Sequence, residues 1–163
     1  MRSNNLALPT MKTAAEIMDA DVPTVSPDAD ARAAIELLAR TEMGAIPVID
    51  AERKVVGIVS ESDLVIGDEE ADLHLPHYLN IMGGIVFVGS MKGFEKRLSK
   101  AFATKVSELM TADPFVVRSD DTADVVARTI AERHHNHLPV VDGEGRLAGL
   151  VTRADALAAL VSG

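Results

Sequence analysis

The alternation of apolar and polar positions predicts a β-α-β-β-α unit in the first part of the chain. Residues 45–49 and 55–59 are apolar runs on either side of a polar turn, which is typical of two paired strands. Residues 34–41 carry apolar side chains at three- to four-residue spacing, which is typical of one helix face. Residues 26–28 (Ser-Pro-Asp) indicate the start of that helix, because a capping hydroxyl, an early proline and a first-turn acid favour helix N-termini. A final helix is expected to open at Ser60.

The same pattern returns 92 residues further along the chain. Residues 16–64 and 108–156 align without a gap, and 15 of their 49 positions are identical, including Asp63 over Asp155. Chance does not produce an ungapped match of this kind, so the chain consists of two copies of one unit. Because a unit of roughly 60–80 residues is marginal alone, we expect the copies to pack together. In the second copy the helix is expected to begin at residues 119–121, and the strands are expected at residues 138–141 and 147–151.

The segment between the two copies is expected to be a helical insert. Apolar residues from Leu75 to Val88 suggest a helix interrupted at Gly83 and Gly84, and later apolar positions continue at four-residue spacing with basic residues on other faces. We interpret this segment as packing on the rest of the protein or on a second subunit; a docking or membrane-surface helix is the alternative. The predicted division is a flexible tail over 1–12, a first unit over 13–66, the insert over 67–104 and a second unit over 105–163.

Charge and composition narrow the classes of partner. The 163 residues carry a formal net charge of −9, which argues against binding to nucleic acid and against attraction to an anionic membrane. The chain has no cysteine, so disulfides, thiolate nucleophiles and cysteine-ligated zinc are excluded. Its longest apolar stretch, residues 81–88, is far shorter than the roughly 20 residues of a membrane span, and its start does not resemble a signal peptide. We therefore expect a cytoplasmic protein.

The repeated motifs resemble those of paired cystathionine-β-synthase (CBS) domains, an arrangement called a Bateman module. The resemblance rests on Met18 and Met110 ahead of the first strand of each copy, on two Pro-Val-(Ile/Val)-Asp runs and on two Gly-x-Val-(Ser/Thr)-x-x-Asp runs. Similarity to that family implies an α/β fold of the α+β type, in which two βαββα units pack about a pseudo-two-fold axis and leave two clefts. It also implies an adenine nucleotide as the ligand, AMP, ADP or ATP, with S-adenosylmethionine and NAD as further candidates and no tightly bound cofactor.

Two hydroxyl–carboxylate pairs are the candidate ribose-binding residues. Thr152 and Asp155 follow a strand of the second copy and lie one helical turn apart, and Ser60 and Asp63 occupy the same positions in the first copy. A strand-to-helix junction offers free amides and the positive end of the helix dipole, and a carboxylate can accept hydrogen bonds from both hydroxyls of a ribose. The resemblance to CBS domains implies that the hydroxyl and the carboxylate of each pair bind a ribose in this way. The alternative is a capping box, in which the same side chains only satisfy amides of the helix.

Three cationic or titratable residues are candidates for phosphate binding. Arg153 lies inside the second motif, where Glu61 stands in the first, so we expect the second copy to hold the better phosphate site. Arg133 and His137 bound a run of basic residues, 133–137, that precedes a strand of the second copy. A solvated loop and a metal site are the alternatives for this run.

An adenine ring needs backbone groups for its edge and apolar walls for its faces. The resemblance implies that extended pieces ahead of the helices supply the edge contacts: Thr24, Val25, Val116 and Val117. The apolar walls are predicted to be Ile46, Pro47, Leu138 and Pro139, for which plain core packing is the alternative.

The sequence favours a regulatory module over an enzyme. It contains no Ser-His-Asp ordering, P-loop, Rossmann glycine fingerprint or HExxH motif, and we predict neither catalytic nor metal-ligating residues. We expect it to bind an adenine nucleotide and to signal to a partner protein that the sequence does not identify. A homodimer is expected, because the apolar insert and the self-similar halves leave surface for a symmetric partner. A ligand-free structural or protein-interaction dimer module is the alternative function.

Overall fold

The computed structural model describes residues 11–64, 78–81, 84–87 and 105–162. Its elements in chain order are α1 (Ala14–Ile17), α2 (Ala31–Arg40), β1 (Ala45–Ile49), β2 (Val55–Ser60), α3 (Glu61–Leu64), β3 (Tyr78–Ile81), β4 (Gly84–Phe87), α5 (Val106–Leu109), β5 (Thr111–Ala112), β6 (Val117–Arg118), α6 (Ala123–Arg133), β7 (His137–Val141), β8 (Leu147–Thr152) and α7 (Arg153–Val161). None of these helices is long and apolar enough to cross a membrane.

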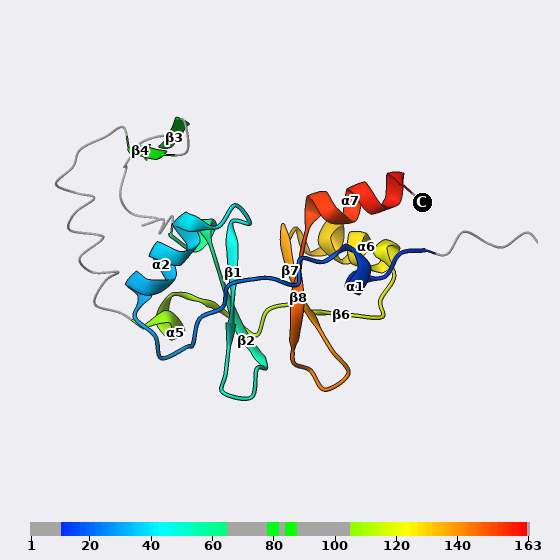
Figure 1. Ribbon diagram of the computed structural model, residues 1–163, viewed down its shortest axis with the longest axis horizontal. Coiled ribbons are helices and arrows are strands. Elements are labelled where there is room, and N and C mark those ends of the chain that lie inside the picture. The colour runs from blue at the N-terminus through cyan, green and yellow to red at the C-terminus, as the bar shows by residue number, and fades with distance from the viewer. Residues whose placement is uncertain (1–10, 65–77, 82–83, 88–104, 163) are drawn as a thin grey trace, which may run out of the picture.

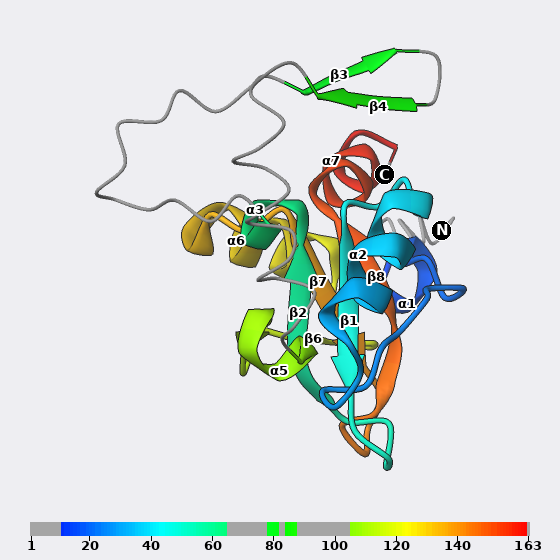
Figure 2. The same ribbon diagram turned by 90° about the vertical axis from the view of Figure 1, so that its left-hand side faces the viewer.

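Two three-stranded sheets lie next to each other, and helices cover their outer sides (Figure 1). The sheet β1-β2-β5 with α2, α3 and α5 is the first unit, and the sheet β6-β7-β8 with α1, α6 and α7 is the second unit. Figure 2 views the first unit from its helical side, with α2 and α5 in front of β1 and β2. This mixed α+β architecture confirms the predicted fold class.

The central hairpins of the two units have the same pairing, displaced by 92 residues. β1 pairs antiparallel with β2 so that Pro47 lies opposite Ile58, and β7 pairs antiparallel with β8 so that Pro139 lies opposite Leu150. Each hairpin also has a register irregularity at the same aligned position. The four predicted strands are therefore confirmed, because short apolar runs around a polar turn pair locally.

The two units exchange their first helices. α1 belongs to the first copy of the sequence, but it packs against α6, α7 and β8 of the second unit. α5 opens the second copy, but it packs against α2 and β2 of the first unit, and the next strand, β5, completes the first sheet beside β2. Asp19 makes the matching antiparallel bridge to Leu150 of the second sheet. Each unit is therefore built from residues of both copies.

Contacts that occur in shifted pairs define the pseudo-two-fold axis. Thr13 bridges to Thr122, and the residues 92 positions away from these two, Lys105 and Asp30, bridge to each other. Lys54 bridges to Arg146, which is its own counterpart in the second copy, so this bridge lies on the axis. Reciprocal bridges of this kind, in which each copy contacts the other through equivalent residues, are the signature of a two-fold relation between the copies.

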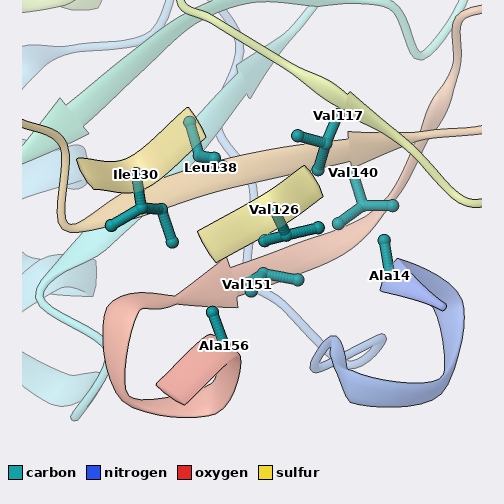
Figure 3. Packing of buried hydrophobic residues seen from close by; sticks show 8 residues of the cluster. All are labelled: Ala14, Val117, Val126, Ile130, Leu138, Val140, Val151 and Ala156. Carbon is teal, nitrogen blue, oxygen red and sulfur yellow. The ribbon is translucent and has the colours of Figure 1, made fainter. Parts of the chain in front are cut away.

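The core of the second unit is aliphatic and draws on its sheet and on three helices. Figure 3 shows Val126 of α6, Val151 of β8 and Ala14 of α1 gathered in one cluster. Ala14 is fully buried in this cluster and Ile17 packs against it, so α1 is attached to the second unit by apolar contacts. The buried members are Ala14, Val117, Val126, Ile130, Leu138, Val140, Val151 and Ala156.

Both long helices begin later than the sequence predicted. α2 starts at Ala31 and α6 at Ala123, about one turn after the predicted starts. In the first copy the Asp28 amide donates to Ser26 Oγ at 3.3 Å, which closes a turn ahead of the helix. Serine and aspartate side chains cap turns as readily as they cap helices. The same residues therefore indicate either a turn or a helix start, and the sequence alone does not distinguish the two.

The described part of the insert is a β-hairpin, and the predicted helix is wrong for these residues. β3 pairs antiparallel with β4, with Asn80 opposite Ile85. Isoleucine, valine, tyrosine and phenylalanine favour strands, so the two short apolar runs are compatible with paired strands, and Gly84 is the first residue of β4, opposite Ile81. The predicted amphipathic segment around residues 94–102 and residues 1–10 of the predicted tail lie outside the described residues.

Candidate functional site

The end of β8 positions the second-copy pair. Thr152 is the last residue of β8 and the N-cap of α7. Asp155 Oδ2 accepts hydrogen bonds from the Thr152 amide at 2.9 Å and from Thr152 Oγ1 at 2.6 Å, and the Asp155 amide donates to Thr152 Oγ1 at 3.2 Å. The pair thus forms the capping box that was the alternative interpretation. Asp155 Oδ1 has no hydrogen-bond donor among the residues that the structure describes.

Ser60 and Asp63 repeat this arrangement where β2 ends and α3 begins. Asp63 Oδ2 accepts hydrogen bonds from the Ser60 amide and from Ser60 Oγ, each at 2.7 Å. Here the second carboxylate oxygen is also engaged, because Thr111 Oγ1 donates to Asp63 Oδ1 at 3.1 Å. Sequence reasoning missed Thr111, which no local motif marks. It reaches Asp63 only because β5 pairs with β2 after the exchange of helices.

The residues predicted for the adenine edge lie where the extended pieces join the sheets. The Val25 amide donates to the Pro47 carbonyl at 3.3 Å, and the Val25 carbonyl accepts from the Ile49 amide at 3.0 Å. Val117 makes the matching parallel pairing in the second unit, opposite Val140. Their neighbours differ in exposure: Thr24 is half-buried and Val116 is exposed. Contact of these four residues with an adenine stays a prediction.

The four residues predicted as apolar walls have fully buried side chains. Ile46 and Leu138 belong to the hydrophobic clusters of the first and second unit, and Pro47 and Pro139 are buried beside them in the strands. Core packing, the alternative interpretation, describes their place in the structure. Contact with a ligand is a prediction that needs these side chains to become accessible.

His137 lies at the boundary between the two units. It pairs with Thr152 across β7 and β8, and its ring faces Gly44 of the first unit: a Cβ placed on Gly44 would come within 3.5 Å of His137 Nε2. Burial lowers the pKa of His137 from its usual range, against the opposing effects of a hydrogen bond to the Met43 backbone and of the Glu61 charge. At neutral pH the imidazole is therefore mainly uncharged, so it interacts through hydrogen bonds more than through charge.

The two candidate arginines are exposed on the second unit. Arg133 ends α6, and its guanidinium lies 4.3 Å from the centre of the Phe115 ring, which also contacts the His135 ring. Arg153 opens α7 and lines a hollow between α6 and α7 together with Leu157. Arg153 and Asp155 are two residues apart in a helix, about 200° around its axis, so their side chains leave on different sides. Phosphate contact by either arginine stays a prediction.

Two small α+β units, related by a pseudo-two-fold axis and joined by exchanged helices, define a tandem domain pair. The family model described as CBS domain matches residues 14–67 and 106–162. The chain therefore belongs to the CBS-domain family, as a tandem pair. Members that consist of such pairs are generally regulatory modules and not catalytic ones.

Several known proteins are similar to the chain over most of its length. The uncharacterized protein MJ1426 of Methanocaldococcus jannaschii is 34% identical over 132 residues, which cover 78% of this chain and 79% of that protein. The chloroplastic CBS domain-containing protein CBSX2 of Arabidopsis thaliana is 29% identical over 163 residues, which cover 96% of this chain and 68% of that protein.

Two solved structures with bound nucleotides are also similar. The crystal structure of CBSX2 in complex with AMP matches with a TM-score of 0.67 and 29% identity, and the match covers 93% of this chain and 97% of that one. The cytosolic domain of the Mg²⁺ channel MgtE in complex with ATP matches with a TM-score of 0.63 and 25% identity, over 90% of this chain and 48% of that one. Related CBS pairs therefore bind adenine nucleotides.

Proposed function

We propose that this CBS pair is a regulatory module that binds an adenine nucleotide between its units and signals occupancy to a partner protein. The observation that carries the proposal is the AMP complex of CBSX2, which shares 29% identity with this chain over nearly its whole length. The ATP complex of the MgtE cytosolic domain supports the same ligand class. We assign the chain no catalytic activity of its own, and S-adenosylmethionine and NAD remain further candidate ligands.

Asp155 is the proposed ribose acceptor. Its Oδ2 is held by the amide and hydroxyl of Thr152, which fixes the plane of the carboxylate. Its Oδ1 is left for the 2′- and 3′-hydroxyls of a nucleotide, and hydrogen bonds to an ionised carboxylate are strong. Capping and ligand binding are therefore compatible, because each uses a different oxygen of the same side chain.

The phosphate is assigned to Arg133, Arg153 and His137. Neither arginine forms an ion pair within the described ranges, so both guanidinium groups are available to a ligand anion. Their different positions on α6 and α7 mean that a phosphate reaches both only if their long side chains turn toward the cleft. Substitution of either arginine should therefore change nucleotide affinity by an amount that depends on the number of phosphates. Substitution of Asp155 should weaken AMP and ATP alike.

A ligand-free structural or protein-interaction module is the second candidate function. The observation that favours it is the complete capping box, because it gives Thr152 and Asp155 a stabilising role without any ligand. Under this function the two hydroxyl–carboxylate pairs would only cap the N-termini of α3 and α7.

We also propose that the module is a homodimer. α7 exposes three apolar side chains to solvent, Leu157, Leu160 and Val161. Apolar residues that gather on one exposed helix are typical of an interaction site. A second copy of the chain could cover them about a two-fold axis.

Calorimetric titration with AMP, ADP, ATP, S-adenosylmethionine and NAD distinguishes the two functions. Under the proposed function at least one of these ligands binds, and at 100 times its Kd it stabilises the fold by about 2.7 kcal/mol. Asp155→Asn keeps a capping oxygen but removes the charge, so it should abolish binding and leave the ligand-free Tm nearly unchanged. Asp124→Asn, at an exposed ion pair of α6, is the matched control and should bind normally. If none of the five ligands binds, the proposed function fails and the interaction module is favoured.

A further inference from the structure

The two duplicated carboxylates differ in the number of acceptor positions that they keep. A carboxylate offers about four lone-pair positions, two on each oxygen. At Asp155 the amide and the hydroxyl of Thr152 use two positions, both on Oδ2. At Asp63 the Ser60 groups use two positions on Oδ2, and Thr111 Oγ1 uses a third on Oδ1. A ribose presents two neighbouring hydroxyls, so Asp155 has a position for each of them and Asp63 does not.

We propose that Thr111 prevents a ribose from binding at Asp63, so that each chain binds one adenine nucleotide, at Asp155. This inference rests on the proposed function and extends it by naming the cleft that is used and the residue that decides it. The Thr111 hydroxyl, 3.1 Å from Asp63 Oδ1, takes the position that a ribose hydroxyl takes at Asp155. A ligand at Asp63 would have to break this hydrogen bond before it could bind.

The difference comes from one pair of aligned residues. Thr111 and Asp19 hold equivalent places beside β2 and β8, and both pair antiparallel with the strand next to them. An ionised Asp19 has no side-chain proton to donate, and its Oδ1 accepts the Asp21 amide at 2.9 Å instead. Asp155 therefore lacks a counterpart of the Thr111 hydroxyl, although the backbone around it is the same.

Charge is a second difference between the Asp63 site and the Asp155 site, and its effect on binding has to be separated from that of the hydrogen bond. Glu61 is exposed at the start of α3, where the second copy has Arg153, and its carboxylate repels phosphate whether or not Thr111 is present. Glu61→Arg removes this repulsion and leaves the Thr111–Asp63 hydrogen bond in place. A change at Thr111 in that background then tests the hydroxyl alone.

The test is the number of AMP molecules bound per chain, measured by calorimetry and repeated with ATP. The wild type and Glu61→Arg should each bind one, and Asp155→Asn should remove it. Glu61→Arg/Thr111→Ala should bind two, and a further Asp63→Asn should return the number to one. The matched control Glu61→Arg/Thr111→Ser keeps a hydroxyl and should bind one. Because Thr111 is exposed, all variants should keep a cooperative thermal transition.

Three results would overturn the assignment to Thr111. They are two nucleotides per wild-type chain, two per chain with Glu61→Arg alone, and one per chain with a folded Glu61→Arg/Thr111→Ala variant. If the wild type binds none of the adenine ligands, the proposed function fails and this inference fails with it. The two failures are therefore distinguishable by whether the wild type binds at all.

Discussion

At the residue scale, two glycines allow methionines to pack across the boundary between the copies. Gly57 of β2 and Gly149 of β8 are aligned residues, and the side chains of Met110 and Met18 lie over them. A Cβ on Gly149 would come within 2.5 Å of the Asp19 carbonyl oxygen and within 2.7 Å of Met18 Sδ. The methionines and glycines that marked the family in the sequence therefore form one contact in the fold.

Gly149→Ala is expected to destabilise the protein by about 1–3 kcal/mol, because the added carbon meets a backbone oxygen that cannot move aside. Gly57→Ala should cost less, since its closest neighbours all belong to the Met110 side chain, which has three rotatable bonds. Urea unfolding of both variants measures the difference. Equal losses for the two variants would contradict this explanation.

The titration of His137 should make the protein less stable as the pH falls. Its folded pKa is lowered from 6.5, mainly by burial and against the Glu61 charge and the Met43 hydrogen bond, so the unfolded chain binds a proton at higher pH than the folded chain. The contribution of neutral His137 to the free energy of unfolding is therefore fully present above the unfolded pKa of about 6.5. It is lost as the pH falls through the folded pKa. His137→Gln should show a smaller fall in Tm between about pH 7.5 and 5.5 than the wild type. The same fall in both proteins would contradict the direction of the shift.

At the element scale, the exchanged helices hold the two copies together. The Ala14 amide of α1 donates to the Asp121 carbonyl at 2.7 Å, and the Val106 amide of α5 donates to the Ala29 carbonyl at 2.9 Å. Ala14 and Val106 are both fully buried, each in the cluster of the other copy. Helices of four residues are not stable alone, so α1 and α5 form only on the unit that receives them.

Val106→Ala should destabilise the protein by about 1–3 kcal/mol through lost burial and a small cavity. Because Val106 packs in the first unit, hydrogen exchange should accelerate more in β1 and β2 than in β7 and β8. Val125→Ala, at an exposed position of α6, is the matched control and should change stability by no more than about 0.5 kcal/mol. Faster hydrogen exchange mainly in β7 and β8 would show that α5 stabilises the sheet of the second unit and would contradict the exchange of helices.

At the scale of the whole molecule, apolar residues left exposed on the second unit indicate where a second copy would bind. Leu157 and Leu160 of α7 are 52% and 45% exposed. α6 and α7 pack on each other, and the hollow between them is lined by three alanines, by Ile130 and Leu157, and by Arg153. A two-fold related copy could place its own α7 against this face.

Leu157→Glu should convert a dimer into a monomer, because it places a charge in the centre of the proposed apolar contact. Ala51→Glu, in the exposed turn between β1 and β2, is the control and should remain a dimer. Light scattering coupled to size-exclusion chromatography gives the masses. A monomeric wild type, or a Leu157→Glu variant that stays dimeric, would refute a dimer through α7.

The sequence by itself determined the features that depend on neighbouring residues. The strands 45–49 and 138–141 followed from short apolar runs beside polar turns, and the hydroxyl–carboxylate pairs followed from residues three positions apart. The constant shift between the copies established the internal repeat, and the resemblance to CBS domains implied the pseudo-two-fold axis. The helix prediction for the insert failed because apolar spacing around two glycines is compatible with both a broken helix and a hairpin.

Only the tertiary structure decided which copy receives each short helix, and with it the contacts of the candidate site. Thr111 reaches Asp63, and His137 reaches Gly44 and Glu61, through packing between segments that are far apart in sequence. Such contacts depend on sheet register and on burial of aliphatic surface, and a repeat with two nearly equal copies offers each helix two similar places. The choice between those places is made by the packing of the complete molecule, which no local pattern encodes.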